Sequence, residues 1–327
     1  MAVPPYGVYT PLVTYFNEDE TVDLYTVAQH ALRMAQGGIA GLVLQGSNGE
    51  APHLLHDERQ KLISHVRKTL DDNSYSRIVL IVGCAAASVF ESLLHIKEAQ
   101  QSGADFALIL PPSYWTAAMN PAVIERFFSD VSCPALCELT SSHAHFDQIA
   151  EESPLPILIY NFPAVTGGID ISSDLISSLA VKHPDKVVGA KLTCGNVGKL
   201  QRLAHPASPR PFAVFAGKSD FFLPALVAGS NGVIAALANI VPKAHVKILE
   251  LYAAGDMKAA IELQTKLSHA DWNLSKVGVA GVKAVITEFY GYGTGRSRRP
   301  LGSFDISTLS TAAKDSISAV VDIEKGL

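Results

Sequence analysis

A lysine at the end of an apolar run is the side chain of this sequence whose position most favours chemistry. Residues 187–196 read VVGAKLTCGN, which places Lys191 after Val-Val-Gly-Ala and before a glycine–asparagine turn. A short apolar run closed in this way predicts a buried strand. Burial disfavours the charged form of a lysine, and a neutral lysine amine attacks a ketone carbon to form a Schiff base. Thr193, two residues further on, is expected on the same strand face.

Polar, aromatic and small residues follow several other apolar runs and complete the set of candidates. They are Ser47 and Asn48 in the segment GSNGE, Tyr114, Tyr160 in the segment YNFP, Gly217 and Ile234. A lyase that works through a Schiff base needs an amine, a group that moves a proton and backbone donors for a carboxylate. The sequence supplies all three at the ends of predicted strands.

Each candidate also has a purely structural explanation. Lys191 at a strand end can extend its amine to solvent, and Thr193 can bond a neighbouring backbone group. Ser47 can serve only as a helix cap in a tight turn, and the two tyrosines can be ordinary packing residues. What favours the functional interpretation is that all of them follow strands of one sheet.

Apolar runs alternate with helical patterns along the first part of the chain. The expected strands are 6–12, 39–45, 77–83, 105–110, 156–160, 186–192, 212–216 and 232–234. Strands that alternate with helices predict a parallel α/β sheet, and eight repeats in about 240 residues suit a (β/α)₈ TIM barrel. An open doubly wound sheet is the alternative, but no expected strand is followed by the glycine-rich dinucleotide fingerprint.

The helical patterns after residue 238 have no strands between them. We therefore expect two units, a barrel over residues 1–238 with an apparent insertion at 131–148, and a small helical appendage over residues 239–327. The active site of a barrel lies at the carboxyl ends of its strands, which is where the candidate residues stand.

Composition narrows the class of protein. The 327 residues carry a net charge of −5, so nothing suggests a nucleic-acid-binding surface, and the short cluster 296–299 (RSRR) is expected to be a solvated loop. No apolar run approaches the roughly 18 residues that span a bilayer. Four cysteines in a chain of this length argue against a disulfide framework. We expect a cytoplasmic protein without a membrane partner.

Three motifs in this order resemble the pyruvate-dependent class I aldolase superfamily. GSNGE, YNFP and GAKLTCGN carry the resemblance, which extends from Gly7 to about Phe304. That superfamily includes dihydrodipicolinate synthase, N-acetylneuraminate lyase, 4-hydroxy-2-oxoglutarate aldolase and the 2-keto-3-deoxy sugar-acid aldolases. The resemblance implies a (β/α)₈ barrel and a Schiff base with pyruvate or another 2-oxo acid, without metal or other cofactor.

The resemblance also implies a role for each motif residue. Lys191 matches the Schiff-base lysine, and Tyr160 matches the tyrosine that moves a proton to and from the substrate. Ser47 and Asn48 match the pair whose backbone N–H groups hold the pyruvate carboxylate. The serine–asparagine pair is closer to the 4-hydroxy-2-oxoglutarate type than to the two threonines that the synthases usually carry.

Three further matches concern the rest of the site. Gly217 and Ile234 match backbone positions that line the pyruvate pocket. Tyr114 matches a tyrosine that family members often insert into the site of a neighbouring subunit. That match implies a homo-oligomer, either a dimer or a tetramer.

One position departs from the synthase pattern. Synthases place an arginine two residues after the proline of their YNxP stretch, where it grips the carboxylate of aspartate semialdehyde. Here that position is Val165, which cannot bind a carboxylate. The expected reaction is therefore cleavage of a 4-hydroxy-2-oxo acid to pyruvate and an aldehyde, with 2-keto-3-deoxy sugar acids favoured and 4-hydroxy-2-oxoglutarate second.

Two other interpretations stay open. The same scaffold is also compatible with dihydrodipicolinate synthase or sialate lyase activity. It is further compatible with a protein that binds a 2-oxo acid without catalysing a reaction.

The apparent insertion contains Cys133, Cys137, His143 and His145. Their close spacing is a weak match to a structural zinc site, so a solvated loop is the favoured interpretation.

Overall fold

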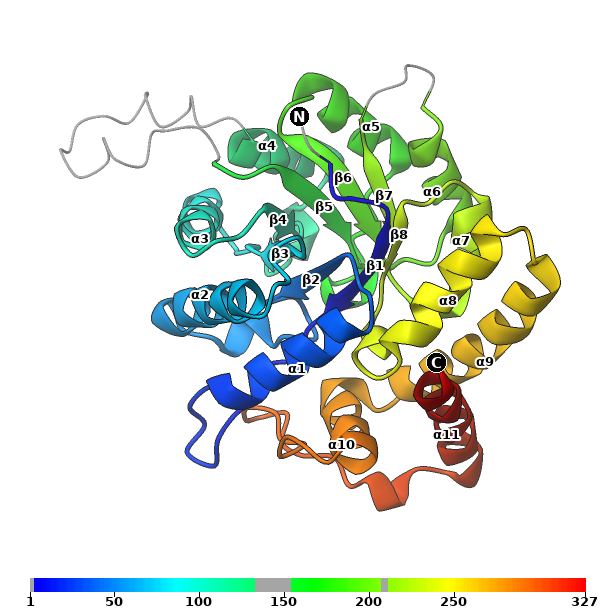
Figure 1. Cartoon of the computed structure of the whole chain (residues 1–327). Coiled ribbons are helices and arrows are strands. Elements are labelled where there is room, and N and C mark those ends of the chain that lie inside the picture. The colour runs from blue at the N-terminus through cyan, green and yellow to red at the C-terminus, as the bar shows by residue number, and fades with distance from the viewer. Residues whose placement is uncertain (1–2, 133–153, 207–210) are drawn as a thin grey trace.

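The computed structural model describes residues 3–132, 154–206 and 211–327. Eight parallel strands pair in chain order, and β8 pairs with β1 to close a barrel (Figure 1). The strands are β1 (Gly7–Pro11), β2 (Gly41–Leu44), β3 (Val79–Gly83), β4 (Phe106–Ile109), β5 (Ile157–Asn161), β6 (Val187–Leu192), β7 (Ala213–Ala216) and β8 (Gly232–Ile234). The closed barrel confirms the predicted fold and excludes the open doubly wound sheet.

Helices surround the barrel on the outside (Figure 1). They are α1 (Leu24–Gln36), α2 (His56–Asp72), α3 (Val89–Gln101), α4 (Pro121–Ser132), α5 (Ser173–Lys182), α6 (Val197–Ala204), α7 (Phe222–Val227) and α8 (Pro242–Ala253). Polar caps begin several of them, because a side-chain oxygen satisfies a backbone N–H that has no partner in the first turn. Asp23 accepts from the N–H of Thr26, and Ser88 accepts from that of Glu91.

The barrel has an apolar interior and a second apolar layer between the strands and the helices. The interior layer is Tyr9, Val43, Ile81, Phe106, Leu108, Leu158, Tyr160, Val188, Ala213, Phe215 and Ile234. Within it, the rings of Tyr9 and Phe215 meet edge to face with 5.0 Å between their centres. This packed interior lies directly beneath the residues at the carboxyl ends of the strands and supports them.

One strand carries an extra residue that changes which side chains face inward. The paired residues of β5 and β6 are Ile157 with Val187 and then Leu158 with Gly189. Val188 is left over, as in a β-bulge, and it belongs to the interior layer. Strict alternation from Val188 would turn Lys191, three residues on, to the outside. Because of the extra residue, Lys191 instead stands opposite the inward-facing Tyr160.

Beyond β8 the chain is helical. After α8 come α9 (Met257–Ser275), α10 (Gly278–Tyr290) and α11 (Thr311–Gly326). Helix α8 contacts β1, which places it as the eighth helix of the barrel, and it also contacts α9 and α11. The division of the chain at 238/239 remains a proposal.

The cluster 296–299 is solvated at Arg296 and Arg299, as its charge suggested, but not at Arg298. The side chain of Arg298 is 14% exposed, its guanidinium pairs with the carboxylate of Glu58, and it lies 4.5 Å from the ring centre of Phe16. The guanidinium makes two hydrogen bonds to the Glu58 carboxylate and also donates to the carbonyl oxygens of His53 and Glu20, so it holds these segments together. The expectation was wrong for Arg298, since the sequence does not show that Glu58 faces this loop.

The first two residues of the predicted insertion, 131–148, are part of a packed helix and not of a surface loop. Helix α4 continues past Phe128 and includes Val131 and Ser132, both of which are buried. Residues 133–148, with the four candidate zinc ligands, lie outside the described residues.

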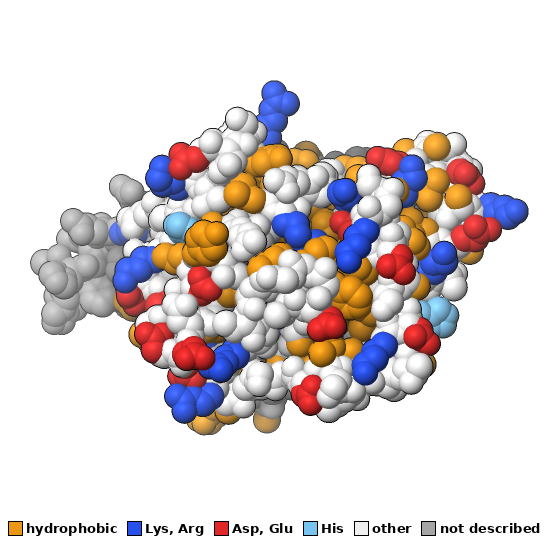
Figure 2. Space-filling model, turned by 60° about the horizontal axis from the view of Figure 1, so that its bottom comes forward, with side chains coloured by type: hydrophobic (Ala, Val, Ile, Leu, Met, Phe, Trp, Pro, Cys, Tyr) orange, Lys and Arg blue, Asp and Glu red, His pale blue; other side chains and the backbone are white. Residues whose placement is uncertain are grey.

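The surface mixes charges of both signs. Figure 2 shows lysine and arginine side chains interspersed with aspartate and glutamate on one face, with apolar side chains between them. Among the residues described, no helix is both long enough and apolar enough to cross a membrane.

Candidate active site

Lys191 and Tyr160 form the centre of the candidate site. Lys191 is on β6 and 2% exposed, Tyr160 is on β5 and 3% exposed, and the two are partners in the ladder. The Nζ atom of Lys191 lies 4.2 Å from the centre of the Tyr160 ring. The predicted amine and the predicted proton carrier are therefore in contact.

Lys191 differs from the other buried lysines of the described chain in its surroundings. Lys199 pairs with the carboxylate of Asp170, and Lys283 pairs with that of Glu50. No carboxylate within the described residues lies at ion-pair distance from Lys191. The Lys191 amine is therefore not engaged in an ion pair within the part of the chain that the structure describes. Lys199 and Lys283 therefore have structural ion pairs, whereas the amine of Lys191 can react with a substrate.

The GSNGE loop presents free backbone donors. Within it, the N–H groups of Gly49 and Glu50 bond to carbonyl oxygens of the same turn. Those of Ser47 and Asn48 make no hydrogen bond among the described residues. Two adjacent N–H groups without acceptors suit an oxyanion such as a carboxylate.

Glu50, the last residue of the GSNGE loop, anchors the loop through contacts of its buried carboxylate. Its backbone has φ +54°, in the left-handed region, and its carboxylate is buried and pairs with Lys283 of α10. The same carboxylate accepts from the backbone N–H of Arg298 at 2.9 Å and contacts His53 at 3.1 Å. The strained backbone is therefore fixed by contacts with the C-terminal helical region.

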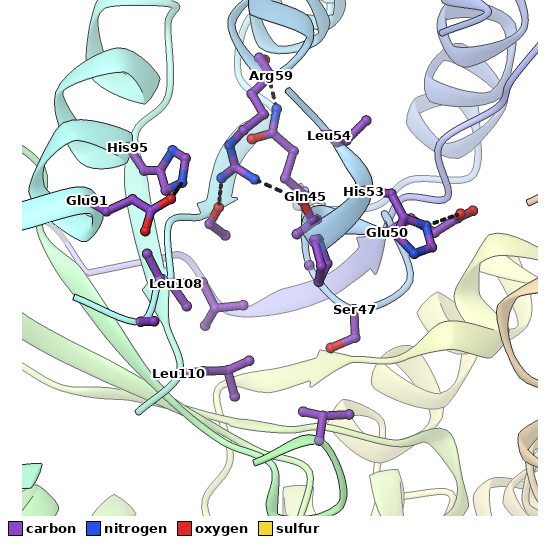
Figure 3. A pocket seen from close by; sticks show the side chains of 18 of the residues that line it. Gln45, Ser47, Glu50, His53, Leu54, Arg59, Glu91, His95, Leu108 and Leu110 are labelled. Atoms are coloured by element: carbon purple, nitrogen blue, oxygen red, sulfur yellow. Dashed lines mark hydrogen bonds and ion pairs between the residues drawn. The ribbon is translucent and has the colours of Figure 1, made fainter. Parts of the chain in front are cut away.

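A cavity of about 650 Å³ opens at the carboxyl ends of β2 to β5. Of the predicted site residues, Ser47, Tyr114, Tyr160 and Val165 line it. Figure 3 shows Ser47 pointing into this space from the loop after β2, opposite Leu108 and Leu110 from the end of β4. Its volume suits a small-molecule ligand.

The remaining predicted residues lie beside or beneath the cavity. Thr193 is buried, and its Oγ1 has no hydrogen-bond partner among the described residues. It packs against Gly217, where an added Cβ would come within 2.1 Å of that oxygen. Ile234 belongs to the interior layer with Tyr160. Asn48 and Lys191 do not line the cavity, and Lys191 contacts Tyr160, which does.

Two predicted residues are exposed at the rim. The side chain of Tyr114 is 79% exposed, with its ring edge to face against Trp115 at 4.7 Å. Val165 ends the short 3₁₀ helix Pro163–Val165 and is 43% exposed. The synthase arginine position thus faces the cavity with an apolar side chain.

The sequence interpretation missed the charged wall of the cavity. Arg59, 5% exposed, lines it and donates to the carbonyl oxygens of Gly83 and Ala51, with no carboxylate partner among the described residues. His95 of α3 lines the same wall, and burial together with the Arg59 charge lowers its pKa to about 3. Both residues belong to helical patterns, so only their burial, which the sequence does not show, distinguishes them from surface charges.

Comparisons with known proteins agree with this geometry. The sequence model of the Dihydrodipicolinate synthetase family matches residues 4–135 and 137–320. The chain belongs to this family. Membership confirms the resemblance that the three motifs indicate, while the roles of single residues stay predictions.

Individual members of the Dihydrodipicolinate synthetase family are similar over the whole chain. The Emericella nidulans protein named "Probable 4-hydroxy-2-oxoglutarate aldolase, mitochondrial" is 41% identical, with 98% of this chain and 96% of the relative covered. The L-threo-3-deoxy-hexylosonate aldolase of Hypocrea jecorina is 40% identical, with both chains covered completely. The crystal structure of YagE from E. coli K12 in complex with pyruvate has a TM-score of 0.79 at 25% identity, covering 99% of each chain.

Proposed function

We propose that this protein is a class I aldolase that cleaves a 4-hydroxy-2-oxo acid to pyruvate, or a related 2-oxo acid, and an aldehyde. The observation that carries the proposal is Lys191, a buried lysine without a carboxylate partner among the described residues and in contact with Tyr160. The curated relatives named above support it, because both are named as aldolases.

In the proposed mechanism the Lys191 amine attacks C2 of the 2-oxo acid and releases water. The resulting iminium draws the electrons of the C3–C4 bond as Tyr160 accepts the proton of the C4 hydroxyl, and the aldehyde leaves. The enamine that remains takes a proton at C3, and water releases pyruvate and restores the amine. Ser47 and a Tyr114 from a neighbouring subunit assist the proton transfer.

The substrate carboxylate binds at the GSNGE loop in this proposal. The free N–H groups of Ser47 and Asn48 are donors fixed before the substrate arrives, so little reorganisation is needed on binding. Gly217 allows Thr193 to pack directly against its backbone, and Ile234 belongs to the apolar interior beneath the site.

Reductive trapping tests the proposal. Pyruvate and borohydride are expected to add one stable mass increment to the chain, and peptide mapping is expected to place it on Lys191. A protein that stays unmodified would point to the non-catalytic binding protein instead. A screen for aldehyde release then compares 2-keto-3-deoxy sugar acids, 4-hydroxy-2-oxoglutarate and sialic acid.

The favoured substrates are 2-keto-3-deoxy sugar acids. Val165 lines the cavity and offers nothing to a second carboxylate, so an uncharged polyol chain suits that part of the cavity better. The relative from Hypocrea jecorina is named for an acid of this type.

4-Hydroxy-2-oxoglutarate is the second candidate, and Arg59 is the observation that favours it. This arginine lines the cavity without a carboxylate partner among the described residues, so a second substrate carboxylate would find a cation there. If this candidate is right, Arg59→Gln lowers kcat/KM for 4-hydroxy-2-oxoglutarate at least tenfold more than for a sugar acid.

Oligomeric state and location belong to the same proposal. The exposed Tyr114 suits a contact with a second copy, so we expect a dimer or tetramer, and a fully active monomer at micromolar concentration in sedimentation would contradict it. A cytoplasmic location stays a prediction from cysteine usage, and one relative carries the word mitochondrial in its name. Cell fractionation decides between them.

A further inference from the structure

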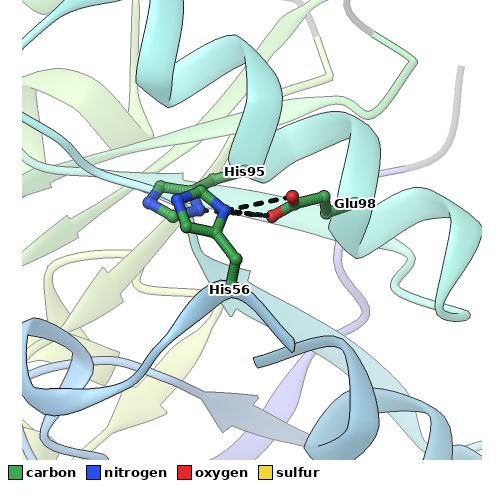
Figure 4. A group of neighbouring side chains, drawn as sticks. All are labelled: His56, His95 and Glu98. Atoms are coloured by element: carbon green, nitrogen blue, oxygen red, sulfur yellow. Dashed lines mark hydrogen bonds and ion pairs between the residues drawn. The ribbon is translucent and has the colours of Figure 1, made fainter. Parts of the chain in front are cut away.

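Two histidines and a glutamate meet outside the Schiff-base centre. His56 begins α2, and His95 and Glu98 lie one turn apart on α3 (Figure 4). One nitrogen or oxygen atom from each of these side chains lies within 4.8 Å of the others. Neither the aldolase reaction nor the predicted site residues use this group.

The distances in the cluster suit a metal ion. The Nδ1 atom of His56 is 2.9 Å from Oε2 of Glu98, and the Nδ1 atom of His95 is 3.6 Å from the same oxygen. Ligands of a tetrahedral zinc ion lie about 3.4 Å apart, since each bond is about 2.1 Å long. One of the two observed distances is shorter than this separation and the other is slightly longer.

The buried nitrogen of His95 provides an independent sign that the cluster binds an ion. His95 is 8% exposed, and its buried Nδ1 has no hydrogen-bond partner among the described residues. That nitrogen faces Oε2 of Glu98 at 3.6 Å, which is too long for a hydrogen bond. A cation between the two groups would give the buried nitrogen a partner and would bind the carboxylate as well.

The other nitrogen of His95 lies near a carboxylate, although beyond hydrogen-bond distance. Its Nε2 lies 4.0 Å from Oε1 of Glu91, on the preceding turn of α3, and Figure 3 shows this pair at the cavity wall. Carboxylates in this position fix the ring and make the metal-bound nitrogen more basic. Glu91 and Glu98 together also outweigh the single positive charge of Arg59 nearby.

The two imidazole rings need one adjustment. They are stacked with 4.6 Å between centres, so both nitrogens cannot aim at one point until a ring tilts. The side chain of His56 is 45% exposed, whereas His95 is 8% exposed, so the tilt falls to His56, whose Nδ1 already faces the Glu98 carboxylate.

We propose that His56, His95 and Glu98 bind one divalent transition-metal ion of the zinc class, which joins the start of α2 to α3 beside the cavity. Two imidazoles and a carboxylate are a donor set that zinc accepts, and three protein ligands leave a fourth position for water. Binding to the folded chain alone raises the melting temperature.

Zinc titration of the full chain, after dialysis against a chelator, tests the proposal. Calorimetry is expected to show one equivalent bound with micromolar or tighter affinity, and a rise in melting temperature. His56→Gln and Glu98→Gln are each expected to weaken binding at least tenfold, about 1.4 kcal/mol, and to remove the rise. X-ray absorption at the zinc edge is expected to show two imidazoles.

Two control variants make the result specific. His269→Gln removes an exposed histidine of α9, and the pair His143→Gln/His145→Gln removes the histidines of the alternative zinc cluster. Both are expected to bind zinc within twofold of the wild type. The proposal is overturned if zinc does not bind at 100-fold excess over protein, if His56→Gln binds it unchanged, or if the pair variant loses it.

Discussion

Lys191 lies directly opposite Tyr160 in the ladder between β5 and β6, with Nζ 4.2 Å from the centre of the tyrosine ring. This pairing depends on Val188, the extra residue of β6, because the side chains of a regular strand alternate. The bulge lets Val188 fill the barrel interior and still turns Lys191 inward three residues later. Bulges often re-aim a side chain next to an active site.

Replacement of Lys191 by alanine is expected to abolish borohydride trapping with pyruvate. The change removes the amine, and it removes no ion pair known in the described structure, so the fold should persist. Intact-mass analysis and circular dichroism measure the two effects. Lys199→Met is the matched control, since it removes another buried lysine. This variant should still form the covalent adduct with pyruvate and borohydride. An undiminished adduct in Lys191→Ala would refute the assignment.

Replacement of Tyr160 by phenylalanine is expected to keep trapping but to lower kcat about 10²- to 10⁴-fold, the usual contribution of a positioned acid–base group. The ring that contacts Lys191 is retained, and only the hydroxyl is lost. Steady-state kinetics on the best substrate from the screen measures the change. Turnover at the wild-type rate would mean that another group moves the proton.

Condensation of pyruvate with aspartate semialdehyde is expected to be negligible. Val165 leaves the second carboxylate without the bidentate pair that an arginine makes. The value of kcat/KM should fall more than tenfold below that of the best substrate, a gap above about 1.4 kcal/mol. Val165→Arg should narrow the gap, whereas Val181→Arg, at an exposed position on α5, should not. Equal efficiency in the wild type would show that Val165 excludes nothing.

Replacement of Lys283 by methionine is expected to destabilise the protein by about 3–5 kcal/mol. The change leaves the Glu50 carboxylate, whose side chain is 1% exposed, without its cation. Urea unfolding gives the difference in free energy. Lys61→Met breaks the exposed pair with Asp57 and should have little effect. An equal loss in both variants would mean that burial of the pair is unimportant.

Asp271 is expected to make stability fall as pH rises from about 4 to about 7. Burial, helped by the nearby Asp220 charge, raises its pKa to about 7, so in this range the folded chain binds the proton that the unfolded chain releases. Each pKa unit corresponds to about 1.4 kcal/mol. In Asp271→Asn, the free energy of unfolding measured with urea should depend less on pH between pH 4 and 7. A variant with the same slope as wild type would contradict the prediction.

The sequence allowed the barrel and most of the site to be predicted because both depend on local pattern. Apolar runs between turn residues marked all eight strands, and the three motifs placed Lys191, Tyr160 and Ser47 at one rim. Helix α6 was missed, since it has only eight residues and follows the glycine–asparagine turn that had already been read as the end of the strand.

What the sequence did not show depends on contacts between distant segments. A lone lysine in an apolar run describes Lys283 as well as Lys191, and only the fold reveals that Glu50 neutralises one of them. The bulge at Val188 is followed by Gly189, a signal that was not interpreted as a bulge because a glycine inside a strand also allows close backbone approach. Arg59 and His95 stand in ordinary amphipathic helices, and their burial beside the cavity follows from how α2 and α3 pack.

The ion pair between Glu50 and Lys283 joins residues 233 positions apart in the chain. On a ribosome, Lys283 is therefore added about ten to fifty seconds after Glu50 at usual rates of synthesis. Throughout that interval the nascent barrel has a carboxylate beneath its substrate loop and no cation to bury with it. The loop that is expected to hold the substrate can reach its final conformation only after α10 has emerged, so an incomplete chain that ends before residue 283 is expected to have strands but no working site.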